Sequence, residues 1–361
     1  MLGGLCGWLG DGAPRDALNA MGERLVGVGD AAIETREATA CAGATRGGTA
    51  AMDGAGTIAL IAGSPRWTDD GLARRAAQVG HAEALLRAWQ QSGPGLLEGL
   101  EGAFALAVLA GNDNRALLAT DRMGRMPLFH AARDGCLIFG STLDAIAAHP
   151  AIDATLSPQA LFHYMYFHAV PSPDAIYQDV ERLRPAHALE WRNGQVTLRR
   201  WWAPDFQADR ATPPETMYEE LRDTLGESVA DAAGEHTAAF LSGGLDSSTV
   251  AGMLARRNGR GAQAYAIGFD AEGYDEIAYA RVARDHFGLD LREYYVTPDD
   301  VADAVPRIAA AYDQPFGNSS AVPAYHCARR AAESGVTRML AGDGGDELFG
   351  GNPPYGKQQV F

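Results

Sequence analysis

The sequence predicts a layered α+β domain followed by an α/β domain built on a parallel sheet. In residues 1–150, short apolar strands and glycine-rich turns surround one clear helix, which is typical of an antiparallel α+β fold. After about residue 212, strands alternate with helices, which indicates a parallel sheet with right-handed crossovers. The length of 361 residues leaves room for both domains.

The N-terminal elements follow from local patterns. Apolar residues recur at near-helical spacing over 71–91, which predicts one helix there. The segment from Gly111 to Asn114 has the composition of a hairpin turn between two apolar runs. The other expected elements are strands over 103–109, 115–120 and 136–140 and a helix around 143–148.

The middle of the chain is expected to be a linker. Residues 151–212 are rich in aromatic residues and are punctuated by prolines, and the stretch from Asp209 to Glu215 is typical of a linker and a helix start. We therefore assign 1–150 to the first domain, 151–212 to the linker and 213–361 to the second domain.

The second domain shows a regular alternation of helices and strands. No segment repeats at a fixed period of about 20–50 residues, which excludes a solenoid. The expected order is helix 214–233, strand 237–241, helix 246–257, strand 263–269, helix 274–287, strand 292–296, helix 298–312 and strand 337–341.

Composition and charge exclude several classes of function. The chain has 30 basic and 46 acidic residues, and its net charge of −16 disfavours binding to nucleic acid or to an anionic membrane surface. No run of apolar residues is long enough to span a membrane. The four cysteines form no C-x-x-C pair, which disfavours a zinc site or a disulfide scaffold and favours a reducing compartment. We expect a soluble cytoplasmic protein.

The most informative segment is the glycine-rich turn from Ser242 to Ser248, with the sequence Ser-Gly-Gly-Leu-Asp-Ser-Ser. It lies between a predicted strand and a predicted helix, so Gly243 and Gly244 let backbone N–H groups approach an oxyanion closely. The helix start and the hydroxyl groups of Ser247 and Ser248 add further donors. We interpret this segment as a phosphate-binding loop, and the alternative is an ordinary capped turn.

The acidic residue of this loop points to a metal ion. Asp246 would repel phosphate unless a cation lay between them, which implies Mg²⁺. The loop contains no lysine, so it is not the phosphate loop of kinases and GTPases. Lys357 is the only lysine in the chain, so a mechanism that needs a buried lysine has a single candidate.

A second turn rich in glycine and aspartate runs from Gly342 to Gly351. It also follows a predicted strand, so in a parallel sheet it reaches the same edge as the first loop. Asp343, Asp346 and Glu347 lie within five residues of one another and would repel each other without a cation. We expect Asp346 to be the second Mg²⁺ ligand, and the alternative is a solvated acidic turn.

Together these segments resemble the asparagine synthetase family. The match rests on Ser242 to Ser248, on Ile267-Gly268-Phe269 and on the stretch from Ala341 to Gly351, where Ala341 replaces the usual serine. The resemblance implies an ATP-pyrophosphatase fold for the second domain, with ATP and Mg²⁺ as cofactors. It also implies adenine contacts from the backbone near Leu241, Ile267, Ala341 and Gly342.

The resemblance extends to further segments of the second domain. Asp275-Glu276 lies where the family has an acidic pair. Asp313-Gln314-Pro315 and Asn318-Ser319-Ser320 match a segment that lies near the substrate carboxylate in the family. The family's synthetase domain continues well beyond the second turn and includes a catalytic lysine, so we expect the second domain of this chain to be partial.

The first domain resembles the family's glutaminase, an N-terminal-nucleophile domain of the αββα type. Such a glutaminase uses an N-terminal cysteine whose α-amine serves as the general base for its own thiol. Cys6 stands at the corresponding position, but Met1 to Leu5 precede it. Cys6 is therefore either a nucleophile released by cleavage after Leu5 or a small buried hydrophobic residue.

The glutamine pocket of the family is altered in this sequence. The N-G-E segment that binds glutamine is replaced by Ala62-Gly63-Ser64, whereas Asp121 is retained as a candidate glutamine-binding residue. Loss of the amide and the carboxylate makes ammonia, or an amine in the substrate, an alternative nitrogen source to glutamine.

The resemblance implies an ATP-dependent, AMP-forming amide ligase, with asparagine formation from aspartate as the family default. The substrate is expected to be a small-molecule or peptide carboxylate, and a homodimer is compatible with the sequence. One alternative is a ligase that uses a substrate amine, similar to lasso-peptide macrocyclases and β-lactam synthetases. Another is a non-catalytic nucleotide-binding fragment. A related enzyme acting on tRNA is disfavoured by the negative charge.

Overall fold

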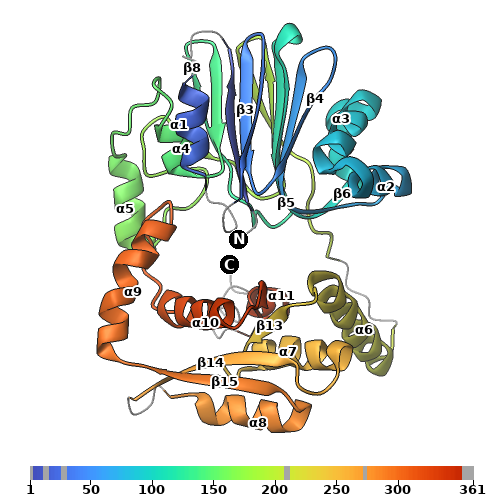
Figure 1. Cartoon of the computed structure of the whole chain (residues 1–361), viewed down its shortest axis with the longest axis vertical. Coiled ribbons are helices and arrows are strands. Elements are labelled where there is room, and N and C mark those ends of the chain that lie inside the picture. Colours follow the sequence, from blue (N-terminus) through green and yellow to red (C-terminus); the bar gives the residue numbers. More distant parts are fainter. Residues whose placement is uncertain (1–2, 11–15, 26–30, 207–211, 271–274, 352–361) are drawn as a thin grey trace. The chain divides into compact units, whose positions relative to one another are not determined.

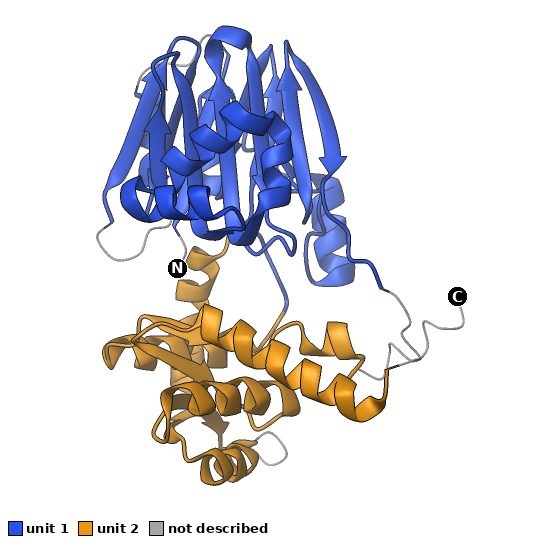
Figure 2. Ribbon diagram, turned by 90° about the vertical axis from the view of Figure 1, so that its right-hand side faces the viewer, with its two compact units in different colours: residues 1–206, 313–317 blue, residues 207–312, 318–361 orange. Residues whose placement is uncertain are grey.

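The computed structural model describes residues 3–10, 16–25, 31–206, 212–270 and 275–351 (Figure 1). The chain divides into two compact units, each of which is described by itself (Figure 2). Unit 1 comprises Met1–Phe206 and Asp313–Gly317, and unit 2 comprises Gln207–Tyr312 and Asn318–Phe361.

Unit 1 contains two antiparallel sheets of six strands each, with the strand orders β10-β8-β9-β1-β3-β2 and β12-β11-β7-β6-β5-β4. The strands are β1 (Gly4–Leu9), β2 (Ile33–Ala38), β3 (Cys41–Arg46), β4 (Thr49–Met52), β5 (Thr57–Trp67), β6 (Leu100–Ala110), β7 (Arg115–Thr120), β8 (Phe129–Arg133), β9 (Cys136–Gly140), β10 (Glu181–Arg182), β11 (His187–Arg192) and β12 (Gln195–Arg200). The helices are α1 (Ala17–Glu23), α2 (Asp70–Val79), α3 (His81–Ser92), η1 (Gly93–Gly99), η2 (Gly111–Asp113), α4 (Leu143–Ala147) and α5 (Pro158–Phe167).

The central strands of unit 1, such as β6, are buried on both faces. In β6, Ala105 and Leu109 belong to the core between the two sheets, whereas Phe104 and Leu106 pack with α3 on the outer face. On the other sheet, β1 contributes to a third core with α1 and α4. Burial on both faces explains why the β6 run is apolar throughout rather than alternating. The layers are helix, sheet, sheet and helix, which confirms the predicted αββα domain.

One local expectation for unit 1 differs from the structure, and another is confirmed. The helix expected over 71–91 is two helices, because Gly80 has a φ of +97° and interrupts the helical backbone. The second helix, α3, is held at its start by Thr49 of β4, whose Oγ1 accepts from the N–H of Ala82 at 3.0 Å. The hairpin expected around Gly111 is present, since β6 pairs with β7 on either side of η2.

Residues 151–206, which the sequence assigns to a linker, belong to unit 1. Strand β11 pairs with β7 and so extends the second sheet, and β12 pairs with β11. The aromatic residues of this stretch serve the packing: Trp191 is 2% exposed, and the Trp201 ring lies 6.1 Å from that of Phe104. The aromatic residues and prolines of this stretch therefore belong to strands and turns of unit 1 rather than to a linker between the domains.

Unit 2 contains a four-stranded parallel sheet in the order β15-β14-β13-β16, which confirms the predicted α/β domain. The helices α7 and α8 pack on one face of the sheet and α10 on the other. The elements are α6 (Pro214–Ala232), β13 (Thr237–Phe240), α7 (Leu245–Asn258), β14 (Gln263–Phe269), α8 (Ile277–Phe287), β15 (Asp290–Val296), α9 (Pro298–Ala311), α10 (Ala321–Glu333), β16 (Arg338–Leu340) and α11 (Gly345–Phe349).

The order of the strands in unit 2 reverses at β13. The chain proceeds from β13 outward to β14 and β15, and then returns to place β16 on the opposite side of β13. Such a reversal opens a crevice at the carboxyl ends of the two strands, which is where open α/β sheets bind ligands. In the described part of the chain, no helix is both long enough and apolar enough to cross a membrane.

Candidate functional site

The turn between β13 and α7 is closely packed around Gly243. Its φ of +91° lies in the left-handed region that favours glycine. A Cβ atom at this position would lie 2.5 Å from the Cβ of Tyr279 and 2.6 Å from the backbone nitrogen of Ala280, both in α8. The turn therefore requires glycine here for two separate reasons.

Two serine hydroxyl groups hold the shape of this turn. The Oγ atoms of Ser242 and Ser247 lie 3.0 Å apart, and the N–H of Gly244 donates to the Ser242 Oγ at 3.3 Å. Gly244 is also the N-cap of α7, and no side chain caps this helix. The first N–H groups of an α-helix lack intrahelical partners, so the start of α7 can donate to an anion.

The turn after β16 packs directly on the turn after β13. A Cβ atom at Gly342 would lie 2.8 Å from the Cβ of Asp246, and one at Gly345 would overlap the Asp246 carboxylate. The carboxylate of Asp246 thus lies against the backbone of the second turn. The structure brings the two sequence-predicted turns together at the crevice beside β13.

The acidic residues of the second turn differ in their surroundings. Asp346 lies in α11 and its carboxylate is close to Gly351, where a Cβ atom would overlap it. Asp343, Asp346 and Glu347 are all exposed. Among the described residues, no group of three or more His, Cys, Asp or Glu side chains could hold a metal by itself. One or two carboxylates combined with phosphate oxygens and water is the usual setting of Mg²⁺, and Asp246 and Asp346 remain the candidates for this role.

The residues expected near adenine lie at the carboxyl ends of three strands. Leu241 is buried, and its N–H donates to the carbonyl of Tyr265 at 2.9 Å. Ile267 is half-buried near the end of β14, and Ala341 and Gly342 follow β16. These positions therefore lie along one edge of the sheet, where the N–H of Leu241 is already engaged in a hydrogen bond.

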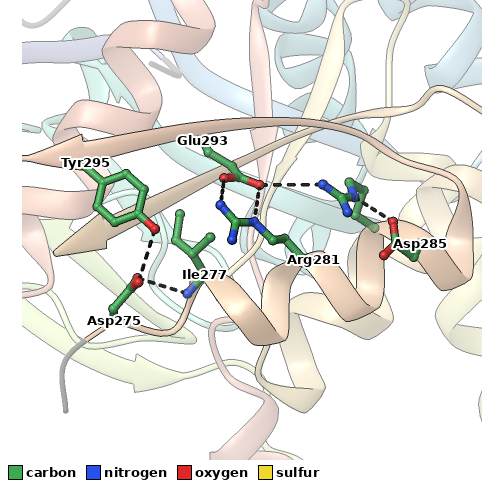
Figure 3. Close-up of polar contacts among 7 residues, drawn as sticks. Asp275, Ile277, Arg281, Asp285, Glu293 and Tyr295 are labelled. Atoms are coloured by element: carbon green, nitrogen blue, oxygen red, sulfur yellow. Dashed lines mark hydrogen bonds and ion pairs between the residues drawn. The ribbon is translucent and has the colours of Figure 1, made fainter. Parts of the chain in front are cut away.

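A polar cluster ties α8 to β15 beside this edge (Figure 3). The carboxylate of Asp275 accepts from the N–H of Ile277 at 3.2 Å and from the hydroxyl of Tyr295 at 3.2 Å. Further along α8, the guanidinium of Arg281 donates to both carboxylate oxygens of Glu293, at 3.0 and 2.6 Å. The hydrogen bonds from Arg281 lower the pKa of the Glu293 carboxyl group, so this pair is ionised at neutral pH.

Cys6, the candidate nucleophile of the first domain, lies inside a strand. Cys6 is in β1, opposite Ala44 on one side and Gly140 on the other, and it is 0% exposed. Burial raises the pKa of its thiol to about 12, so the thiolate is scarce at neutral pH. The preceding residue is fixed as well, because the N–H of Leu5 donates to the Oγ of Ser141 at 3.0 Å.

Asp121 is fully buried, and its carboxylate accepts hydrogen bonds from backbone N–H groups. It accepts from the N–H groups of Phe104 at 3.3 Å, Met123 at 3.0 Å and Met126 at 3.1 Å. Arg125 lies 3.5 Å away as an ion-pair partner. In this arrangement Asp121 shapes the turn that follows β7.

The substituted glutamine-binding segment, Ala62-Gly63-Ser64, lies within β5 and pairs with β6. A Cβ atom at Gly63 would overlap the carbonyl oxygen of Ala103, so the two backbones are in close contact. Lys357, the single lysine, lies outside the described residues.

Several contacts at the site could not be predicted from the sequence. The packing of Tyr279 on Gly243 and the bond from Tyr295 to Asp275 join residues that are separated by long stretches of chain. Asp313, for which the sequence predicts a place near the substrate carboxylate, is grouped with unit 1. Its carboxylate accepts from the N–H of Leu143 at 2.9 Å, and burial raises the pKa of this carboxyl group.

Comparison with known proteins matches each unit separately. Residues 220–361 match the asparagine synthase family, and residues 71–202 match the glutamine amidotransferase domain family. A putative glutamine-hydrolysing asparagine synthetase of Mycobacterium bovis is 32% identical over 286 residues, which cover 76% of this chain. This chain belongs to the asparagine synthetase family. The order of the two matched domains along the chain agrees with the order of units 1 and 2.

Other members of the asparagine synthetase family are also similar. Asparagine synthetase 1 of Bacillus subtilis is 28% identical over 71% of this chain, and a putative asparagine synthetase of Methanocaldococcus jannaschii is 28% identical over 74%. The chain spans 43%, 40% and 53% of the lengths of these three relatives. Among solved structures, a glutamine PRPP amidotransferase of B. subtilis is similar at a TM-score of 0.37 and 10% identity, over 82% of each chain.

Membership of the asparagine synthetase family gives each unit its type. Unit 1 is an amidotransferase-like domain of the N-terminal-nucleophile fold, and unit 2 is a parallel-sheet ATP-pyrophosphatase domain. The second type of domain implies the use of ATP.

Proposed function

We propose that the chain activates a carboxylate with ATP and forms an amide, with AMP and pyrophosphate as the other products. The observation that carries this proposal is the packing of Gly342 and Gly345 on Asp246, which joins the two turns at one crevice. In the first step a carboxylate oxygen attacks the α-phosphorus, and the bond to the bridging oxygen of pyrophosphate breaks. In the second step a nitrogen attacks the acyl carbon and AMP leaves.

Within this proposal the first turn holds the leaving pyrophosphate. The N–H groups at the start of α7 and the hydroxyl groups of Ser247 and Ser248 donate to its oxygens, where negative charge develops in the transition state. Gly243 lets the turn pack directly against α8, which fixes the position of these donors. Asp246 and Asp346 hold Mg²⁺, which supplies positive charge against the leaving group. The backbone near Leu241, Ile267 and Gly342 binds adenine.

For the nitrogen we propose ammonia or an amine of the substrate rather than glutamine. Cys6 is fully buried with a thiol pKa of about 12, and its backbone nitrogen is an amide, which is not a base. Asp121 is already bonded to three N–H groups. These contacts support a structural role for unit 1. Glutamine hydrolysis by the purified chain that is lost in Cys6→Ala would contradict this part of the proposal.

The experiment that tests the activation step is exchange of labelled pyrophosphate into ATP. The full chain is assayed with Mg²⁺ and a panel of carboxylates that begins with aspartate. We expect exchange with at least one carboxylate, and a decrease of roughly 100-fold in Asp246→Asn and in Asp346→Asn. Asp343→Asn, in the same turn, is the matched control and is expected to stay near the rate of the unaltered chain.

The outcomes separate the candidate functions. Binding of ATP without exchange for any carboxylate would favour the alternative of a nucleotide-binding protein without turnover. Failure to bind ATP at all, with Mg²⁺ present, would overturn both. The product formed with the active carboxylate, analysed by mass spectrometry with ammonia or with amines as donors, distinguishes asparagine formation from the formation of another amide.

A further inference from the structure

A second cavity lies in unit 2, away from the two turns. Its volume is about 470 Å³, which is within the range of small-molecule sites. No residue from Ser242 to Ser248 or from Gly342 to Gly351 contributes to its lining among the residues described. It is lined by Tyr265, Ala266, Ile267, Arg292, Glu293, Tyr294, Cys327, Arg330, Glu333 and Ser334.

The cavity forms between the edge of the sheet and α10. Tyr265 of β14 is opposite Arg292 of β15 in the register, and Ile267 is opposite Tyr294, so these four side chains share one face of the sheet. Tyr265 packs with Cys327 of α10 on that face. Glu293 alternates to the other face, where it meets α8 (Figure 3). Its carboxylate is therefore turned away from α10.

A buried hydroxyl group in the wall of the cavity lacks a partner. Tyr265 is 3% exposed, and within the described part of the chain its hydroxyl oxygen makes no hydrogen bond. A buried polar group without a partner is unfavourable, and such groups in native proteins point to a missing ligand or water. The hydroxyl of Tyr294, by contrast, already has a partner, because it donates to the carboxylate of Asp300 at 3.0 Å.

The charged groups of the lining favour an anion. Arg330 lies over the ring of Tyr294, with its guanidinium carbon 4.1 Å from the ring centroid. The carboxylate of Glu333 accepts from Arg329 at 2.9 Å and from Arg330 at 3.4 Å. Arg292, the second arginine of the lining, donates to the carboxylate of Asp290 at 2.9 Å, so each arginine has one acidic partner. A guanidinium has five N–H donors, so each arginine can still donate to a bound anion.

We propose that this cavity binds a small organic carboxylate. Its oxygens accept hydrogen bonds from the guanidinium groups of Arg292 and Arg330, which match a planar carboxylate, and from the hydroxyl of Tyr265. The apolar part of the ligand lies against Ile267 and Cys327. The lining contains no residue of either turn, and it shares Ile267 with the backbone positions proposed to contact adenine. The carboxylate-binding groups Arg292, Arg330 and Tyr265 have no part in the proposed ligase activity, so the two proposals can fail separately.

Calorimetric titration of the full chain with benzoate and glutarate tests the site. We expect saturable binding of at least one of them at a single site, and binding of the neutral analogue benzamide about tenfold weaker or worse. Arg292→Gln and Arg330→Met are each expected to weaken carboxylate binding by about tenfold. Tyr265→Phe, which keeps the ring, is expected to weaken it by about threefold to tenfold.

Arg329→Met is the matched control, because Arg329 lies on the same helix and carries the same charge but does not line the cavity. Its effect on carboxylate binding is expected to stay within about twofold. Absence of saturable carboxylate binding would overturn the proposal. Equal losses in Arg329→Met and Arg330→Met would do the same, as would tight binding of inorganic phosphate in place of both carboxylates. Unchanged ATP affinity in Tyr265→Phe shows that any loss of carboxylate binding is local.

Discussion

Replacement of Gly243 by alanine tests whether the first turn has the shape described. The new Cβ would lie 2.5 Å from the Cβ of Tyr279 and 2.6 Å from the nitrogen of Ala280. Carbon atoms in ordinary contact are about 3.5–4.0 Å apart, so one side must move by about 1 Å. α8 resists this movement because Arg281 binds both oxygens of Glu293 on β15.

The expected cost of Gly243→Ala can be worked from these contacts. The left-handed backbone costs a residue with a Cβ about 1–2 kcal/mol, and overlap in a packed site costs about 1–3 kcal/mol. Together these destabilise the turn by about 2–5 kcal/mol. Gly244→Ala is the matched control. The φ of Gly244 is −67°, and the nearest atom to its added Cβ would be the Ser242 Oγ at 3.4 Å. Its expected effect is below about 1 kcal/mol.

Hydrogen exchange measured by mass spectrometry is the suitable assay, because all six tryptophans lie between residues 8 and 202 and their fluorescence reports on unit 1 alone. In Gly243→Ala, peptides from β13 and α7 are expected to exchange at least about 30-fold faster. A shift of about 1 Å in the turn is expected to weaken ATP binding by about tenfold or more. Equal exchange rates and equal ATP affinities in Gly243→Ala and Gly244→Ala would refute the reasoning.

Three further predictions concern other parts of the chain. Asp121→Ala leaves three buried N–H groups without their acceptor and is expected to destabilise unit 1 by about 2–4 kcal/mol, as measured by tryptophan fluorescence in urea. Cys6 is expected to react with iodoacetamide at pH 8 at least about 1,000-fold more slowly than an exposed cysteine, because its thiol pKa is about 12. Hydrogen bonds from Thr297 lower the pKa of the Asp300 carboxyl group to about 2, so the protection of α9 amides against hydrogen exchange, relative to the unfolded chain at the same pH, is expected to decrease as the pH falls from about 4 towards 2.

Each of these predictions has a control and an opposing result. For Asp121, the exposed Asp113→Ala is expected to change stability by less than about 0.5 kcal/mol, and equal effects of the two variants would contradict the buried role. The thiol of Cys6 keeps its proton to a higher pH when folded, so stability decreases as the pH rises above about 8.5, and Cys6→Ala is expected to weaken this dependence. Burial also raises the pKa of the Cys41 thiol, so part of the dependence of unit 1 is expected to remain. Asp300→Asn is expected to abolish the acid dependence in α9, and persistence of that dependence would point to another group.

Much of unit 2 could be predicted from local sequence. The strand over 263–269 has the predicted bounds, and the parallel order follows from the alternation of strands and helices. Both turns were assigned from their glycines and acidic residues, because close backbone approach and repelling carboxylates leave few other uses for such residues. The contact between Gly345 and Asp246 was not predictable in detail, since it depends on β16 returning to the side of β13.

Unit 1 shows the limits of local patterns more clearly. The helical periodicity over 71–91 continues through Gly80, so only the backbone conformation reveals two helices. The stretch 151–206 has the composition of a linker, yet β11 in this stretch pairs with β7 and extends the second sheet. Asp313 belongs to a sequence motif of the second domain, but its carboxylate accepts from the N–H of Leu143 in unit 1. This contact could not be predicted, because the two residues are distant in the sequence.

The sequence by itself determined the two types of domain, the family, and the residues of both turns, because these depend on periodicity and on residues whose chemistry is local. Only the tertiary structure decided that Cys6 is fully buried in β1 and that the Asp121 carboxylate accepts hydrogen bonds from three backbone N–H groups. It also decided that Tyr265 and Arg330 share a cavity. Burial and the meeting of distant side chains are set by the packing of whole elements, and that packing lies beyond any single segment of the sequence.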